Sequence, residues 1–306
     1  MKAFVAVTDN DWFDFLRRRP ELTEVNFWQP GGGRHFRALD PGQPLLFKLH
    51  YPQNYIVGGG FFAAFSLFPL SLAWETFGIQ NGVPNLEELR RRTARLRHQD
   101  LDPRRDYEIG CIILEDPFFL DEAQWIPAPA DFSKNVVVGK GYDLRAPAGK
   151  ALWDGVLAAR GLQVHRAAEP VVGPMYGEPA LFRPRLGQGA FRVAVTDVYD
   201  RHCAVTGEKT LPVLDAAHIR PVAAGGTHRI DNGLLLRSDV HTLFDCGYVT
   251  ITPDFKFRVS QRLKADWDNG KPYYQLDGSR IWVPNSERER PARKELEWHS
   301  DTIFLR

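Results

Sequence analysis

The chain has 306 residues, 43% hydrophobic and 25% charged, as is typical of a soluble globular protein long enough for two domains. No run of about 18 apolar residues predicts a membrane span, and the first residues lack the basic region and cleavage site of a signal peptide. The net charge of +1 gives no argument for nucleic-acid binding, and three cysteines make no disulfide framework, so we expect a reducing, cytoplasmic setting.

The first block, residues 1–165, contains several apolar runs bounded by turn residues, which predict β-strands. The run at residues 55–68 contains glycines 58–60 and is expected to form strands broken by turns. The predicted strands cover residues 44–50, 55–68, 107–116 and 135–144.

Two helices of this block are recognised by their ends. A short helix is expected over 71–78, with Ser71 as its N-cap and Gly78 at its C-terminal end. A second helix is expected over 150–161, where a glycine again ends it.

A third helix, 85–98, concentrates positive charge. Asn85 followed by Glu88 is a capping-box pattern for its start. Such a charged run forms either a solvated helix face or a set of phosphate contacts, which give affinity without reading sequence. Its arginines are Arg90, Arg91, Arg92, Arg95 and Arg97.

Residues 166–186 are rich in proline and glycine without periodicity, and we interpret them as a linker. An amphipathic helix over 190–202 then opens the second block, 187–306.

The stretch "LDAAHIRPVAAGGTHRIDNGLLLRSDVHTLFDCG" is the part of this block that carries chemistry. A strand ending near His218 places Asp215 and Ala217 on one face and His218 on the other. Asn232 and the following glycine predict a turn into a second short strand. Ser238 is the expected N-cap of a helix with His241 in its first turn, so strand, loop, strand and helix surround one point.

These side chains suit phosphodiester hydrolysis. His218, with a pKa near neutrality, can act as the general base. Asp215 and His241 can hold a divalent ion, with Mg or Mn favoured over Zn. The side-chain amide of Asn232 can fix the loop by bonding to backbone and so orient His218.

The same residues resemble the His-Asn-His (HNH) endonucleases, which have a ββα-metal fold. The resemblance covers about residues 187–306 and implies that His218 is the general base, Asn232 the structural asparagine and His241 a metal ligand. Many members carry Asp or His directly before the first histidine as a ligand. Here Ala217 stands there, and Asp215 is our substitute.

Many HNH proteins also carry two Cys-x-x-Cys pairs that bind structural zinc. Here Thr206 stands where the second cysteine of a pair beginning at Cys203 would be, and Cys246 stands alone. We therefore expect no structural zinc and a subdomain held together by packing. Arg220 and Arg229 flank the site as candidate phosphate ligands or plain surface arginines. His228 and His299 are assigned to structure or loops, although His299 could contact phosphate.

The first block resembles the PUA-like superfamily, which includes EVE, ASCH, YTH and SRA-type domains. The resemblance rests on an aromatic segment, "PGQPLLFKL", a turn and "YIVGGGFF" over residues 1–160. Several such domains hold a modified or flipped base between aromatic side chains, which recover the cost of unstacking. The candidates, each of which could instead be core, are Trp28, Phe27, Tyr55 and Trp74, with Asn54 or His50 for the base edge. Glycines 58–60 would allow close backbone approach to the base.

The sequence therefore predicts an α+β protein in which a PUA-like, β-barrel-type domain with helices is linked to a ββα-metal HNH nuclease domain. We expect a metal-dependent DNA endonuclease of the restriction kind. It would act on double-stranded DNA carrying a modified base and would cut both strands as a homodimer. DNA contacts are assigned to Arg220, Arg229, Arg90, Arg91 and Arg95.

Two other hypotheses stay open. One is a non-catalytic nucleic-acid-binding protein with a decayed nuclease site, for which Ala217 is the best support. The other is an HNH nickase or toxin whose N-terminal domain binds a protein partner.

Overall fold

The computed structural model describes residues 1–31, 36–98, 102, 105–133, 135–161 and 187–306. The chain divides into two compact units, Met1–Pro184 and Arg185–Arg306, each built of sheets and helices. The expected linker, 166–186, lies outside the described residues. In the parts described, no helix has both the length and the apolar character needed to cross a membrane.

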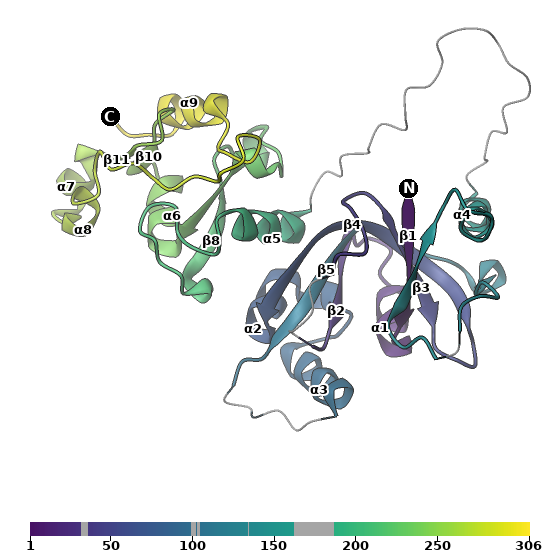
Figure 1. Ribbon diagram of the computed structural model, residues 1–306. Coiled ribbons are helices and arrows are strands. Elements are labelled where there is room, and N and C mark those ends of the chain that lie inside the picture. The colour runs from purple at the N-terminus through teal and green to yellow at the C-terminus, as the bar shows by residue number, and fades with distance from the viewer. Residues whose placement is uncertain (32–35, 99–101, 103–104, 134, 162–186) are drawn as a thin grey trace, which may run out of the picture. The chain divides into compact units, whose positions relative to one another are not determined.

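The N-terminal unit is built on one mixed sheet of seven strands among the described residues (Figure 1). Its path runs β2-β5-β4-β3-β1-β7, and β6 pairs with β4. The pair β1 and β3 is parallel and the other pairs are antiparallel. The strands are β1 (Lys2–Thr8), β2 (Glu24–Gln29), β3 (Pro44–Leu49), β4 (Tyr55–Pro69), β5 (Glu108–Phe119), β6 (Ile126–Pro127) and β7 (Gly139–Asp143).

Strand β4 differs from the prediction of short strands broken by turns. It is one element of 15 residues, and its register with β5 shifts at two irregularities. The glycines allow neighbouring backbone to approach, since a Cβ on Gly58 would lie 2.3 Å from the Phe118 carbonyl oxygen and one on Gly59 2.7 Å from that of Leu45. Glycines 58–60 are buried in the sheet, so strand packing accounts for them without a base. Strand β7 is shorter than the expected 135–144.

The helices of this unit are α1 (Asn10–Leu16), α2 (Leu70–Phe77), α3 (Leu86–Arg97) and α4 (Pro147–Ala159), with 3₁₀ turns at Gly78–Asn81 and Glu122–Gln124. The expected cap of α3 is confirmed, because the Asn85 side chain accepts the Glu88 backbone N–H at 2.8 Å. The prediction for Ser71 was wrong. Helix α2 begins one residue earlier, and the Ser71 hydroxyl donates to Asp106 instead.

Aromatic side chains dominate the core between α1 and the sheet. Trp12 meets Phe27 and Phe47 edge-on, with ring centroids 5.3 and 5.1 Å apart, and Phe47 is fully buried. Such offset geometries add to the free energy of burial. Helix α1 is thereby fixed against β2 and β3.

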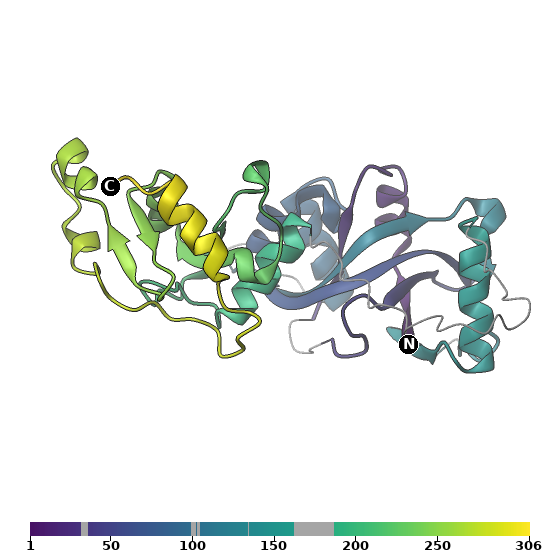
Figure 2. The same ribbon diagram turned by 90° about the horizontal axis from the view of Figure 1, so that it is seen from above.

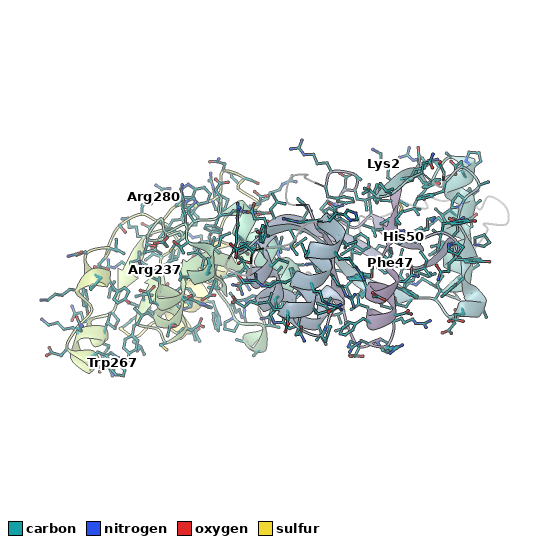
Figure 3. The ribbon with its side chains drawn as sticks, turned by 90° about the horizontal axis from the view of Figure 1, so that it is seen from below. Lys2, Phe47, His50, Arg237, Trp267 and Arg280 are labelled. Atoms are coloured by element: carbon teal, nitrogen blue, oxygen red, sulfur yellow. The ribbon has the colours of Figure 1, made fainter. Side chains whose placement is uncertain are left out.

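The C-terminal unit consists of two hairpins and five helices among the described residues, with α9 lying across it (Figure 2). Phe191, Tyr199, Phe244 and Leu296 form its buried centre. Trp267 on α7, in contrast, is 66% exposed and points outward (Figure 3). The elements are α5 (Gln188–Val198), β8 (Leu214–His218), β9 (Gly233–Arg237), α6 (Ser238–Asp245), β10 (Val249–Ile251), β11 (Phe257–Val259), α7 (Gln261–Trp267), α8 (Lys271–Tyr274) and α9 (Arg293–Thr302).

Candidate active site in the C-terminal unit

The hairpin β8–β9 and the helix α6 that follows it provide the frame of the site. Asp215 pairs with Leu236, and His218 pairs with Gly233. The expected turn at Asn232 and Gly233 is a 3₁₀ turn, Ile230–Asn232, and Gly233 is extended. A side chain at Gly233 has no room, since its Cβ would lie 2.5 Å from Val195 Cγ2.

Helix α6 begins at Ser238 without a side-chain cap, so the expected N-cap role of Ser238 was wrong. Its hydroxyl donates to the Val213 carbonyl at 3.1 Å, which ties the start of α6 to the segment before β8. His241 lies one turn into the helix, facing the hairpin.

These elements surround a pocket of about 660 Å³. Strand alternation predicts Asp215 and His218 on opposite faces, but both line this pocket, while Ala217 is fully buried in the core. The ionisable side chains that line it are Asp215, His218, His228, His241, Asp245 and Arg192.

His241 lies between two carboxylates. Its Nδ1 is 3.4 Å from Asp215 Oδ2, and its Nε2 is 3.3 Å from Asp245 Oδ2. Burial lowers the pKa of His241, but the Asp215 hydrogen bond and the two negative charges outweigh it and raise the pKa overall. The hydrogen bond with His241 lowers the pKa of Asp215, whereas burial raises that of Asp245. Asp215 is therefore the carboxylate best kept ionised.

The donor set and spacing of this pair fit a divalent ion. Two atoms that ligate one ion at about 2.1 Å lie roughly 3.0 to 3.4 Å apart, close to the distance between Asp215 Oδ2 and His241 Nδ1. In the described part of the chain, no group of three or more His, Cys, Asp or Glu side chains is arranged to hold a metal. Two side-chain ligands would leave the other coordination positions of a divalent ion to water.

His218 faces the same pocket from the end of β8. Its ring stacks on Phe191, with centroids 4.0 Å apart and an interplanar angle of 11°. Burial, helped by the neighbouring His228 and His241, lowers the pKa of His218 to about 4. The ring is therefore neutral at physiological pH and can accept a proton, but the expected pKa near neutrality was wrong, because burial disfavours the charged ring.

Asn232 holds the loop between the two strands. The residue is 2% exposed, and its side chain accepts the Arg220 backbone N–H at 3.0 Å and donates to the carbonyls of Arg220 and Thr227, each at 2.9 Å. Its own carbonyl accepts the Ile219 N–H at 2.9 Å. The predicted bonding of the Asn232 amide to loop backbone is confirmed, and it acts directly beside His218.

The arginines assigned to DNA have partners within the protein. Arg220 donates to the Ala224 carbonyl and lies over Trp298, and Arg229 forms two hydrogen bonds with Asp231. In the N-terminal unit, Arg91 pairs with Glu88, Arg95 with Asp9, and Arg90 with Asp106. Arg92 likewise pairs with Glu88, and Arg97 donates a hydrogen bond to the Pro30 carbonyl. These contacts favour the solvated-face reading of α3, although Arg91 and Arg95 stay largely exposed.

His299 has a structural role, as expected. The residue is 2% exposed, and its ring stacks on Phe244, with centroids 3.6 Å apart. Nδ1 accepts the Thr250 hydroxyl at 2.9 Å, and Nε2 donates to the Phe244 carbonyl at 3.1 Å. Both ring nitrogens are thus used inside the core, and the suggested phosphate contact was wrong.

The turn at residues 203–206, where the first pair of zinc-binding cysteines would lie, is held by packing and hydrogen bonds. Cys203 is fully buried, and its sulfur accepts the backbone N–H groups of Thr206 and Arg237 at 3.4 and 3.3 Å. The thiol therefore links this turn to the end of β9.

A second pocket, of about 640 Å³, lies in the N-terminal unit. Trp28, Phe27 and His50 line it together with Trp12 and Asp9. The Trp28 indole is fixed by its Nε1–H, which donates to the Asn81 carbonyl at 2.9 Å. Leu96, Val137 and Val138 also line the pocket and are exposed.

The other base-pocket candidates lie elsewhere. Tyr55 packs on Trp125, with ring centroids 6.0 Å apart. Asn54 is a turn residue with φ of 55°, and Trp74 lies on α2. Among the residues described, none of these three lines the pocket.

Three residues at this pocket were not predicted from the sequence. Phe191 and His228 reach it from the helix α5 and the loop, and no local pattern marks either as a site residue. Asp245 had a detectable signal, because it lies four residues after His241 and therefore on the same helix face. Asp9, which lines the N-terminal pocket, was also missed.

The structure of an ASCH protein from Zymomonas mobilis is similar to the N-terminal half, with 11% identity and a TM-score of 0.35, covering 50% of this chain and 94% of that one. A structure described as the modification dependent TagI restriction endonuclease has 14% identity and a TM-score of 0.28, covering 98% of this chain and 81% of that one. No curated protein matches the chain.

The sequence of the C-terminal unit matches the model of one family, described as HNH endonuclease, over residues 203–252. That range contains Asp215, His218, Asn232, His241 and Asp245. The C-terminal unit therefore carries an HNH endonuclease domain, and the pocket between β8, β9 and α6 lies within it.

Proposed function

We propose that the chain is a metal-dependent DNA endonuclease whose chemistry takes place at His218. The observation that carries this proposal is the arrangement of one neutral histidine and one carboxylate–imidazole pair around a single pocket. The donor set of Asp215 and His241 suits Mg or Mn.

His218 takes a proton from a water molecule as the water oxygen forms a bond to phosphorus. The bond from phosphorus to the leaving sugar oxygen breaks in the same displacement, and that oxygen takes up a proton from solvent. Asp215 and His241 would hold a divalent ion, which would supply positive charge near the phosphate and the leaving oxygen. Asn232 keeps the loop beside His218 in place, and the Phe191 ring fixes the plane of the imidazole.

The N-terminal pocket supports a second part of the proposal, in which this unit directs the nuclease to a modified base in double-stranded DNA. A cavity of about 640 Å³ lies within the usual range of small-ligand sites. A flipped base would stack on Trp28 and Phe27, with Asp9 and His50 available to its polar edge. The enzyme would be of the restriction kind, and two copies would be needed to cut both strands.

A non-catalytic DNA-binding protein is the second candidate. It is favoured by Ala217, which is buried where many HNH proteins have a metal ligand. It is also favoured because no group of three or more metal-ligating side chains occurs in the described part of the chain.

Cleavage of supercoiled plasmid in Mg²⁺ or Mn²⁺ distinguishes the two candidates. An endonuclease converts the plasmid to open-circular and linear forms, and EDTA stops it. A non-catalytic protein shifts the mobility of the DNA without changing its topology.

A further inference from the structure

His228 lies outside the three signature positions His218, Asn232 and His241 but directly contacts His218, the proposed general base. Its Nδ1 is 3.0 Å from His218 Nε2, and the two rings meet at 65° with centroids 4.9 Å apart. His228 is half-buried and also lies beside Phe191, with centroids 5.7 Å apart. Both histidines line the same pocket.

The loop holds His228 in this place. Asn232 Nδ2 donates to the carbonyl of Thr227, the residue directly before His228. Gly226 allows the loop to fold tightly, because a Cβ there would lie 1.8 Å from the Arg220 carbonyl oxygen. One asparagine therefore positions both histidines, since its other bonds hold Ile219 and Arg220 next to His218.

The hydrogen bond between the rings allows two proton arrangements. A neutral imidazole has one N–H donor and one acceptor nitrogen. If His228 Nδ1 donated the bond, the only lone pair of His218 would be occupied and its Nδ1 would carry the proton. If His218 Nε2 donates, His218 Nδ1 keeps a free lone pair. Only the second arrangement leaves His218 able to take a proton from water.

We propose that His228 is a positioning residue that holds His218 in the tautomer with the proton on Nε2 and a free Nδ1. The role in catalysis rests on the proposed nuclease function. In the reaction an O–H bond of water breaks and an N–H bond forms at His218 Nδ1. His218 becomes an imidazolium, and its Nε2–H bond to His228 strengthens as the donor gains charge. Loss of the Nδ1 proton to solvent restores the base.

The matched variants are His228→Asn and His228→Phe. The Asn amide oxygen takes the place of Nδ1 as an acceptor, while Phe keeps a ring in the loop but has no acceptor. His98→Asn serves as a control, since His98 is an exposed residue of the N-terminal unit with a φ of 52°, which Asn tolerates.

The first experiment reads the tautomer without any DNA. Nitrogen-15 NMR of the full chain with labelled histidine, assigned with His218→Gln, should show the His218 proton on Nε2 in the wild type and in His228→Asn. His228→Phe should show a mixture of both tautomers. A wild-type His218 with its proton on Nδ1 would overturn the proposal, whether or not the protein cuts DNA.

The second experiment measures plasmid cleavage. Loss of support around a site commonly costs about 10- to 100-fold, so His228→Phe should lower kcat by that factor while KM changes less than about 3-fold. His228→Asn should recover most of the loss, and His98→Asn should match the wild type. Equal losses in His228→Phe and His228→Asn, with both variants folded, would contradict a positioning role. If the wild type cuts no DNA, the nuclease proposal fails, while the tautomer experiment still decides the role of His228.

Discussion

Asp215 and His241 are 26 positions apart in the sequence, yet their side chains lie 3.4 Å from each other. The hairpin brings one from β8 and the following helix brings the other. Each affects the ionisation of its partner, because their hydrogen bond lowers the pKa of Asp215 and works to raise that of His241. An ion binding between them would replace this hydrogen bond.

Asp215→Asn should weaken binding of Mn²⁺, because a neutral amide is a poorer ligand than a carboxylate. We expect a loss of affinity of about 10- to 100-fold, similar to that for lost supporting groups at metal sites, measured by calorimetry on the full chain. Asp231→Asn, which changes a carboxylate paired with Arg229, is the matched control. Unchanged Mn²⁺ affinity in Asp215→Asn would remove this residue from the ligand set.

His218→Ala should abolish most cleavage, since loss of a general base typically costs about 10²- to 10⁴-fold in rate. The variant should keep its DNA affinity and its metal affinity, because Asp215 and His241 remain. Cleavage rates and gel-shift binding measured side by side check this. Residual activity within a factor of two of the wild type would show that another group accepts the proton.

Asn232→Ala should destabilise the C-terminal unit, because it leaves one backbone N–H and two carbonyls of the loop without their partner. Net hydrogen-bond contributions of about 1 kcal/mol each predict a loss near 2 to 3 kcal/mol in the free energy of unfolding. Urea unfolding of the full chain measures it. Limited proteolysis should also cut faster between Ile219 and Asp231, and unchanged protection there would contradict the role assigned to Asn232.

The stability of the protein should fall in mild acid, partly because of His299. Burial lowers the pKa of His299 from 6.5 to about 4. Below pH 6.5 the unfolded chain takes up a proton that the folded chain resists, so this contribution is full above pH 6.5 and is lost as the pH falls toward 4. Between pH 7 and 5 the loss should be about 2 kcal/mol.

His299→Gln, compared with the wild type by urea unfolding at pH 7 and 5, isolates that contribution. The variant should be less stable at pH 7 but lose less stability on acidification. His218 has a pKa lowered in the same direction, so some pH dependence should remain. An identical pH dependence in both proteins would mean that His299 is not titrating as described.

Trp28→Ala should remove selective binding to modified DNA, because the indole lines the N-terminal pocket and is fixed by Asn81. Base stacking is worth about 1 to 3 kcal/mol, so affinity for the preferred oligonucleotide should drop roughly 5- to 150-fold. Trp267→Ala, at an exposed tryptophan of the other unit, is the control. Equal effects of the two variants, measured by fluorescence anisotropy, would exclude a base pocket at Trp28.

Local sequence patterns predicted much of the candidate site in the C-terminal unit. The strand before His218, the strand after Asn232 and the helix bearing His241 all follow from short runs with clear ends. Asn232 was identifiable because its side chain acts on backbone close in the sequence. The pairing of Asp215 with His241 needed only the order of these elements.

Other features depend on contacts between distant segments and could not be predicted in this way. His228 looks like any loop histidine until the fold of the loop places it on His218. The glycines of β4 resemble turn signals in the sequence. In the structure they lie within one long strand, where backbone and side chains of neighbouring strands approach them closely. Serine is a residue type that often caps helices, but the Ser71 hydroxyl donates its hydrogen bond to the carboxylate of Asp106, 35 positions away.

Cleavage of plasmid DNA in Mg²⁺ or Mn²⁺ by the wild type and by His218→Ala tests the central claim most directly. The substrates should be unmodified, cytosine-methylated and hydroxymethylated plasmid. We predict cutting of a modified substrate by the wild type and cutting about 10²- to 10⁴-fold slower by His218→Ala. Cutting of every substrate would keep the nuclease and contradict the modified-base reader, whereas cutting by His218→Ala at the wild-type rate would contradict the active site itself.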